Sequence, residues 1–225
     1  MIVPHRNPVL TAKMLSTVDV LSGGRLIVGV GVGWLEEEFQ ALDTPPFNRR
    51  GKVTDEYIRI FKVLWNEQNP SFEGSYYNFP SLQFAPKPLQ NGGPPIWVGG
   101  QSRAAIRRVV KLGDAWHPVG ANPASPLEPE ELATEVDYMH SMCERYDRDP
   151  SELSITMKAP IYDVEVVGDG GRRRFSGAPD QIIEDIIEYE NTGVSHIILD
   201  TRSSGLQQFI EKMDWLSGEV IENFR

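Results

Sequence analysis

The sequence contains one cysteine and four histidines in 225 residues, and it has no long apolar run. The single thiol, Cys143, excludes an intramolecular disulfide and a thiolate metal cluster. No two histidines have the spacing of helical metal ligands, so we expect no metal site. No apolar segment approaches the ~20 residues of a membrane-spanning helix, and the first residues lack the apolar core of a signal peptide. We therefore expect a cytoplasmic protein with no membrane partner.

Basic residues are fewer than acidic residues in this chain. It carries 22 Lys and Arg against 32 Asp and Glu, a formal net charge of −10. Such a surface repels nucleic acid and anionic membranes, so neither is expected as a main partner. Two local charge runs, Glu36–Glu38 and residues 172–174 (Arg-Arg-Arg), are interpreted as ordinary solvated charge.

Short β-branched runs alternate with helical patterns along the chain. Each run is too short for a helix and has the nearly continuous apolarity of a strand covered on both faces. This alternation predicts an α/β fold with a parallel sheet and right-handed crossovers, which an open doubly wound sheet and a closed (β/α)₈ barrel both satisfy. The predicted strands are residues 26–31, 96–98, 115–117, 155–161 and 194–199.

Three predicted helices carry clear apolar stripes. The first begins at Asn7-Pro8, where Asn can cap the helix and Pro suits its first position, and it ends at Gly23-Gly24. Further helices are predicted from Ser102 to Gly113 and over residues 178–192. The stripes comprise Leu10, Met14, Val18 and Leu21; Tyr57, Ile60, Phe61, Leu64 and Trp65; and Leu206, Phe209, Ile210, Met213, Leu216 and Val220.

Residues 68–95 interrupt the alternation of predicted strands and helices. Residues 72–79, Phe-Glu-Gly-Ser-Tyr-Tyr-Asn-Phe, alternate and contain turn formers, which predicts a small hairpin. The flanks lack the polar composition of a linker, so we interpret the segment as an insertion within a βα repeat. Its aromatic residues are compatible with either the floor of a hairpin or a ligand cover.

Two glycine motifs follow predicted strands. Residues 29–34, Gly-Val-Gly-Val-Gly-Trp, do not fit the dinucleotide pattern G-x-G-x-x-G, because Trp34 stands where the last glycine is required. Glycines on one strand face admit either a packed side chain or a flat ring. Residues 99–103, Gly-Gly-Gln-Ser-Arg, precede a helix, where free N–H groups and a guanidinium suit an anion such as phosphate, although a glycine turn with a Ser cap is the simpler alternative.

Asn7, Gly33, Gly100 and His117 are all predicted at the carboxyl ends of strands, the rim where α/β folds bind ligands. His117 can protonate or hydrogen-bond a substrate, or it can be a satisfied surface imidazole. Asn7 can equally be only a helix cap.

The ordered set of these fragments resembles the bacterial luciferase-like oxidoreductase family, in its probable coenzyme F420-dependent branch. The resemblance is dense over residues 1 to about 120. The fragments that carry it are 6–8 (Arg-Asn-Pro), 21–26 (Leu-Ser-Gly-Gly-Arg-Leu), 29–34 with Glu38-Phe39, 86–88 (Pro-Lys-Pro) with Gln90, 94–100 (Pro-Pro-Ile-Trp-Val-Gly-Gly) and 113–116 (Gly-Asp-Ala-Trp).

The resemblance implies a (β/α)₈ TIM barrel in which FMN or F420 binds at the carboxyl ends of the strands. By motif, it implies that Asn7 contacts the ring system and that the backbone of Gly99 and Gly100 approaches the ribityl-phosphate side. We also expect Gln101 and Ser102 on the phosphate side and Gly33 in the cofactor site. Trp34, Trp116 and His117 would then shape the substrate pocket. The expected activity is hydride transfer between F420 and a small organic substrate.

Family chains start about two and a half βα units earlier, so we expect Met1 to fall near the end of the third strand of a single barrel domain over residues 1–225. The positions that would supply a catalytic acid or base are then absent, and we assign none. Two alternatives stay open: an FMN-dependent monooxygenase fed by a separate flavin reductase, and a truncated, non-catalytic barrel fragment. An F420 reductase and a homodimer are also compatible with the family.

Overall fold

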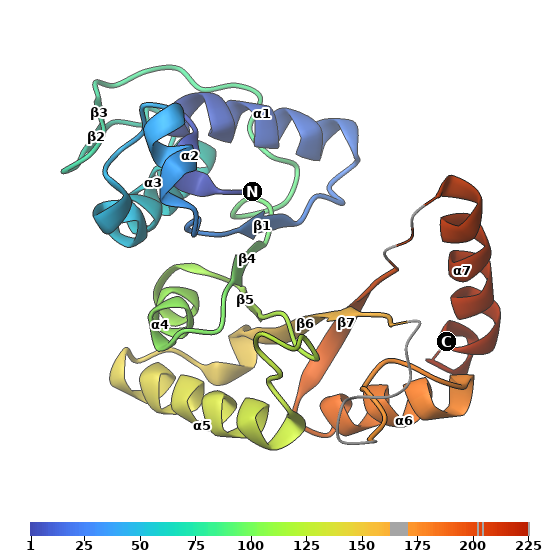
Figure 1. The fold of residues 1–225 in the computed structure, drawn as a ribbon. Helices are drawn as coiled ribbons and strands as arrows, with labels where there is room; N and C mark the ends of the chain where they lie inside the picture. The colour runs from blue at the N-terminus through green and yellow to red at the C-terminus, as the bar shows by residue number, and fades with distance from the viewer. Residues whose placement is uncertain (163–170, 202, 204, 225) are drawn as a thin grey trace. The chain divides into compact units, whose positions relative to one another are not determined.

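The computed structural model describes residues 1–162, 171–201, 203 and 205–224 (Figure 1). Contacts within the chain divide it into two compact units. The first comprises residues 1–99 and 104–115, and the second comprises residues 100–103 and 116–225. The expectation of one domain over residues 1–225 stays a prediction.

The first unit contains a parallel pair of strands and the helices that precede and follow them. Val28 of β1 lies opposite Ile96 of β4, and Val30 lies opposite Val98. The elements are η1 (Val3–His5), α1 (Pro8–Leu21), β1 (Val28–Val30), α2 (Glu36–Ala41), η2 (Phe47–Arg49), α3 (Arg50–Asn66), β2 (Phe72–Glu73), β3 (Asn78–Phe79), β4 (Ile96–Gly99) and all but the first residue of α4 (Arg103–Leu112).

The second unit contains a longer parallel pair, β6 and β7, in which Thr156 lies opposite His196 and Pro160 opposite Asp200. A parallel bridge between Val119 and Lys158 extends this pairing to the segment after β5. The elements are the end of β5 (Ala115–His117), α5 (Pro129–Arg145), η3 (Pro150–Glu152), β6 (Ser154–Pro160), α6 (Pro179–Glu190), β7 (Val194–Asp200), α7 (Leu206–Glu219) and η4 (Ile221–Phe224).

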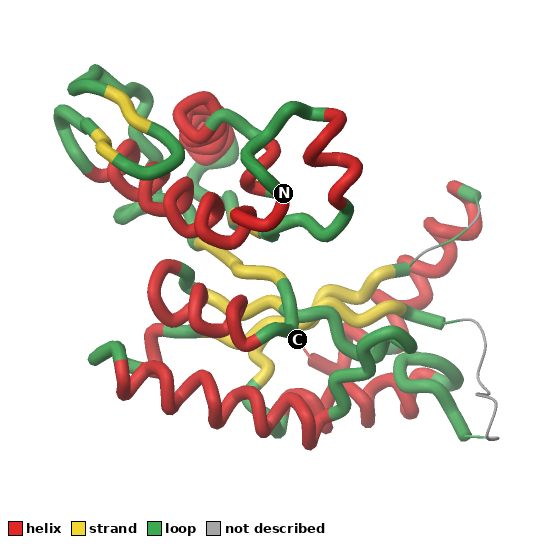
Figure 2. Tube along the Cα trace, turned by 60° about the vertical axis from the view of Figure 1, so that its left-hand side comes forward, coloured by secondary structure: helices red, strands yellow, loops and turns green. Residues whose placement is uncertain are grey.

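The sequence located these elements to within a few residues. All five predicted strands are present, and the hairpin predicted over residues 72–79 forms as the antiparallel pair β2–β3, whose two short strands are drawn in yellow in Figure 2. The stripe on α3 is buried throughout. None of the described helices is long and apolar enough to cross a bilayer.

Helix α1 buries the face opposite to its apolar stripe. Leu10, Met14, Val18 and Leu21 are 59%, 56%, 47% and 81% exposed. The buried residues are small or polar, namely Pro8, Thr11, Ala12, Ser16 and Asp19. Small side chains let α1 approach α3 closely enough for the Trp65 indole to donate a hydrogen bond to the Ala12 carbonyl at 3.2 Å. Periodicity therefore located the helix but not its packed face.

The stripe on α7 is likewise only partly buried. Leu216 and Val220 lie in the core, whereas Leu206 is 75% exposed and Met213 is 49% exposed. The apolar stripe thus meets the rest of the second unit only near the carboxyl end of the helix.

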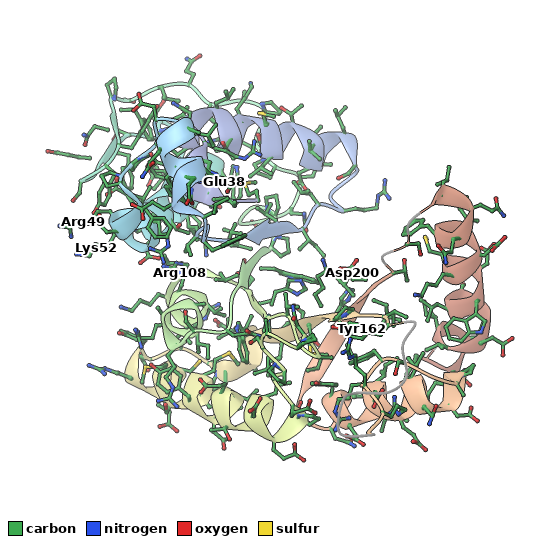
Figure 3. All side chains as sticks on the ribbon, in the orientation of Figure 1. Glu38, Arg49, Lys52, Arg108, Tyr162 and Asp200 are labelled. Carbon is green, nitrogen blue, oxygen red and sulfur yellow. The ribbon has the colours of Figure 1, made fainter. Side chains whose placement is uncertain are left out.

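Buried charges connect the helices of the first unit. Arg108 of α4, labelled in Figure 3, forms an ion pair with Asp55 of α3 and donates to the Gly51 carbonyl at 3.1 Å. Asp19 of α1 is fully buried, and its carboxylate accepts the Leu89 and Gln90 N–H groups at 2.8 and 3.1 Å and the Gln90 side-chain amide at 2.7 Å. Asp19 therefore holds the end of the 68–95 insertion against α1.

Replacing Asp19 should cost far more stability than replacing an apolar residue of the same helix. Asp19→Ala removes a fully buried carboxylate and leaves its three partly buried donors without this acceptor, so we expect the free energy of unfolding to fall by about 2–4 kcal/mol. Met14→Gln, on the exposed face, should change it by less than about 0.5 kcal/mol. Urea unfolding followed by circular dichroism measures both, and equal losses would contradict the packing of α1.

Candidate functional site

The nine predicted site residues divide between the two units. Four lie in the first unit (Asn7, Gly33, Trp34 and Gly99), and five lie in the second (Gly100, Gln101, Ser102, Trp116 and His117).

Asn7 caps α1, as its sequence context predicts, and it has a second partner. Its Oδ1 accepts the Leu10 N–H at 3.0 Å, and its Nδ2 donates to the Tyr77 hydroxyl at 2.9 Å. Tyr77 belongs to the hairpin insertion, 70 residues along the chain. Asn7 is nevertheless exposed, so its amide stays accessible to a ligand.

Gly33 lies where no side chain fits. Its φ is +81°, and a Cβ there would come within 2.8 Å of the Phe39 ring and 3.1 Å of Ile2. Packing alone therefore accounts for this glycine, and only its backbone could meet a ligand. The neighbouring Trp34 is 80% exposed, so its indole forms part of the surface of the first unit.

In the second unit, Gly100 to Ser102 form a loop that side chains hold on both sides. The Trp116 indole donates to the Gly100 carbonyl at 2.8 Å. The Gln101 amide donates to the Val119 carbonyl and accepts the Ser125 hydroxyl. Trp116 is fully buried, so it supports Gly100 from the core rather than facing open space. The fixed loop leads directly into α4.

The guanidinium predicted beside this loop is directed elsewhere. Arg103 lies 3.3 Å from the Glu135 carboxylate and stacks over the Tyr138 ring at 4.5 Å, both on α5. Its charge is thereby partly neutralised. The loop itself lies at the amino-terminal end of α4, where the peptide dipoles of the helix give a partial positive charge.

His117 is held in one tautomer by Thr156. The Thr156 hydroxyl donates to the Trp116 carbonyl at 3.2 Å, since a carbonyl can only accept. The same hydroxyl oxygen lies 2.7 Å from His117 Nδ1 and must accept from it. Neutral His117 therefore carries its proton on Nδ1 and its lone pair on Nε2.

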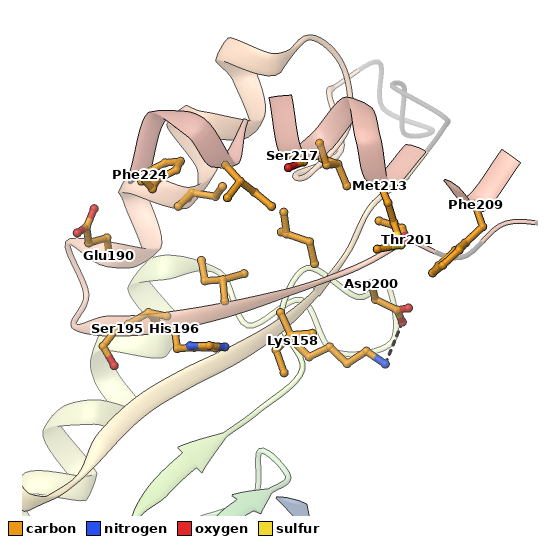
Figure 4. A pocket seen from close by; sticks show the side chains of 17 residues that line it. Lys158, Glu190, Ser195, His196, Asp200, Thr201, Phe209, Met213, Ser217 and Phe224 are labelled. Atoms are coloured by element: carbon orange, nitrogen blue, oxygen red, sulfur yellow. Dashed lines mark ion pairs between the residues drawn. The ribbon is translucent and has the colours of Figure 1, made fainter. Parts of the chain in front are cut away.

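Polar side chains from β6 and β7 share the sheet face that carries Thr156. Side chains alternate along a strand, so Thr156, Lys158, His196 and Asp200 lie on the same face in the observed register. Figure 4 shows His196 and Lys158 on neighbouring strands, with Lys158 paired to Asp200 at 2.9 Å. Burial, then the positive charges of His196 and Lys158, lower the pKa of His117 below its usual value. His117 is therefore neutral at neutral pH.

A hollow of about 820 Å³ lies between β7 and the helices α7 and η4 (Figure 4). None of the nine predicted residues lines it. Its walls are largely apolar and include Ile197, Leu199, Phe209, Met213, Leu216 and Phe224. Lys158, His196 and Asp200 also line it, so the hollow includes polar groups at its edge.

Comparison with known proteins assigns the chain to a family. A family profile described as luciferase-like monooxygenase matches residues 1–165. The chain belongs to the luciferase-like monooxygenase family.

Two relatives are FMNH₂-dependent dimethylsulfone monooxygenases. The one from Pseudomonas putida is 37% identical over 124 residues, 54% of this chain and 34% of its own length. The one from Pseudomonas fluorescens is 27% identical over 214 residues, 85% and 58% of the two chains. The chain thus spans about one third to three fifths of the length of these luciferase-like relatives.

Similarity to solved structures confirms the α/β fold of the luciferase-like barrel. The chain aligns with an F420-dependent secondary alcohol dehydrogenase, crystallised with an F420–acetone adduct, at a TM-score of 0.76. The alignment covers 96% of this chain and 74% of that protein, at 18% sequence identity. At this identity the similarity concerns the fold alone. The predicted family and fold are therefore confirmed. The relatives and structural neighbours described here are oxidoreductases, and they include monooxygenases.

Sequence reasoning missed the partners that hold the predicted site residues of this luciferase-like chain. Tyr77 was noted only as an aromatic residue of the insertion, and Thr156 only as part of a strand. The alternation of Thr156 and Lys158 with the buried Ile155, Met157 and Ala159 could have indicated a polar strand face. Nothing in the local sequence could have paired Asn7 with Tyr77.

The lowered pKa of His117 makes stability depend on pH in a defined direction. As the pH falls below about 6.5, the unfolded chain binds a proton before folded His117 does, so the free energy of unfolding falls. His117→Gln should remove this contribution and flatten the dependence between about pH 7.5 and pH 5. Urea unfolding at several pH values measures it. His140→Gln, an exposed position on α5, is the control and should keep the wild-type slope, whereas an unchanged slope in His117→Gln would refute the assignment.

Proposed function

We propose that this chain supplies the cofactor-binding part of a luciferase-like oxidoreductase that acts on a small organic substrate. The observation that carries the proposal is the Gly100–Ser102 loop. Its carbonyl and side-chain groups are bonded to Trp116, Val119 and Ser125, which fixes the loop at the amino-terminal end of α4. The dipole at that end of a helix favours an anion. Both candidate cofactors, FMN and F420, carry a phosphate beyond their ribityl chain, and such a loop suits a phosphate.

The proposed roles follow the residues of each unit. In the first unit, Asn7 would hydrogen-bond the ring system, with the Gly33 backbone beside it, and Trp34 would contribute to the substrate pocket. Gly99, which ends β4 in the first unit, would bind the phosphate side, as would Gly100 to Ser102 in the second unit. Trp116 would hold Gly100 from behind.

His117 would accept a hydrogen bond or proton from a substrate through Nε2. The neutral Nδ1–H tautomer that Thr156 imposes supports this role. The cofactor itself would supply the redox chemistry, and the protein would bind, orient and exclude water.

The sequence relatives favour FMN over F420. The two dimethylsulfone monooxygenases named for FMNH₂ are matched at 37% and 27% identity, whereas the F420-dependent dehydrogenase is matched at 18% and supports only the fold. Use of reduced FMN would imply a separate flavin reductase as a partner. Hydride transfer with F420, the expectation from the sequence motifs, is the second candidate.

Titration with each cofactor distinguishes the two candidates. We expect FMN, oxidised or reduced, to bind at micromolar or lower concentration and F420 at least about tenfold more weakly. Fluorescence quenching of the cofactor measures both. The reverse preference would favour F420 as the cofactor. No binding of either cofactor by the wild-type chain would refute the proposed function.

Removing the hydrogen bonds that fix the Gly100–Ser102 loop should weaken the binding of the cofactor's phosphate and not that of its ring. Gln101→Ala removes the bonds to Val119 and Ser125, so we expect about five- to tenfold weaker FMN binding, near 1 kcal/mol, and unchanged binding of riboflavin, which has no phosphate. Fluorescence titration with the two compounds gives the comparison. Gln40→Ala, an exposed position on α2, is the control. Equal weakening for both compounds would argue against phosphate binding at this loop.

A further inference from the structure

Glu56 of α3 holds the turn of the hairpin through a buried carboxylate. Only 3% of the residue is exposed. Its Oε2 accepts the Ser75 N–H, and its Oε1 accepts the Tyr76 and Tyr77 N–H groups, each at 2.8 Å. Three backbone donors directed at one carboxylate compensate its buried charge and are stronger than neutral hydrogen bonds. The turn is therefore fixed to α3.

The close approach of the turn requires a glycine beside it. A Cβ at Gly74 would lie 2.6 Å from both Cδ and Oε1 of Glu56. A larger residue would push the turn away from the carboxylate. The insertion thus contains both the donors and the space that Glu56 needs.

The fixed turn presents the side chain of Tyr77 to Asn7. The Tyr77 ring packs edge-on against Tyr57 at 6.1 Å and lies 6.5 Å from Phe79. Its hydroxyl accepts a hydrogen bond from Asn7 Nδ2 at 2.9 Å. Glu56 therefore determines where this hydroxyl lies, although it contacts only the backbone of Tyr77.

Two hydrogen bonds determine the orientation of the Asn7 amide. The Leu10 N–H needs an acceptor, which fixes Oδ1, and the amide nitrogen then lies toward Tyr77. The amide nitrogen has a second N–H, and the Tyr77 hydroxyl has its own proton to donate. The pair thus has two donors on heavy atoms 2.9 Å apart, at an exposed position of the first unit.

We propose that Asn7 and Tyr77 act as one two-donor unit that binds acceptor atoms on the polar edge of the cofactor ring, with Glu56 as the positioning residue behind it. This inference rests on the proposed function, because it concerns the same cofactor. It gives the 68–95 insertion a role in binding: the insertion brings the second donor to the residue that caps α1.

Cofactor affinity tests the pair. Tyr77→Phe removes only the hydroxyl, and Asn7→Ser keeps a helix cap but loses the amide donors. Each should weaken binding of FMN, or of F420 if that is the cofactor bound, by about tenfold. The double variant should be weakened by clearly less than the product of the two single effects, because the residues act together.

Tyr76→Phe is the matched control. It makes the same change at the neighbouring residue, whose hydroxyl takes part in none of the hydrogen bonds found among the described residues, and it should bind within about twofold of wild type. A Tyr77→Phe protein that binds as tightly as wild type, or a double variant with the full product of the single effects, would overturn the proposal while leaving the proposed function intact. Failure of the wild-type chain to bind either cofactor would instead overturn the function.

A second readout does not need the cofactor. In ¹H–¹⁵N spectra of the free protein, the side-chain NH₂ signals of Asn7 are identified by their loss in Asn7→Ser. They should shift in Tyr77→Phe and in Glu56→Gln, and stay in place in Tyr76→Phe. Asn7 NH₂ chemical shifts that are unchanged in Tyr77→Phe would refute the pairing. Shifts that are unchanged in Glu56→Gln would refute the positioning role.

Discussion

A buried carboxylate must be surrounded by donors, and this requirement at Glu56 organises the part of the first unit in which Tyr77 meets Asn7. The donors come from the backbone of the hairpin turn rather than from a basic side chain. Backbone donors are rigid, so satisfying the charge also fixes the position of the turn. Asp19 applies the same principle at the other end of the insertion, where it accepts two backbone N–H groups and one side-chain amide. Lys87 adds bonds from its ammonium group to the Leu64 and Glu67 carbonyls, each at 2.6 Å.

In the second unit, neutral hydrogen bonds do the corresponding work. Trp116 contributes at both ends of one short network, since its indole holds Gly100 and its carbonyl receives the Thr156 proton. The same residue thereby supports the proposed phosphate loop and sets the tautomer of His117. A fully buried indole is well suited to this, because its surroundings leave it a single orientation.

The sequence predicted the positions of the elements better than their packing and side-chain contacts. Strand and helix positions followed from local patterns, and Asn7 as a helix cap followed from Asn-Pro before an apolar stripe. The apolar stripe on α1 located the helix but did not identify its buried face, because the stripe is exposed. Close packing of α1 on α3 and the buried Asp19 outweighed the transfer of four apolar side chains from water. The role of Arg103 also differed, since Glu135 on a distant helix engages its charge.

The sequence by itself determined the order and type of the elements, the location of the insertion and the membership of the luciferase-like family, because these depend on patterns within short stretches of chain. Only the tertiary structure decided which helix faces are buried, which tautomer His117 adopts, and that Asn7 meets Tyr77. Those features depend on donors and acceptors that are far apart in sequence, such as the 70 residues between Asn7 and Tyr77. A hydrogen bond between such groups leaves no periodicity in the chain, so only folding reveals it.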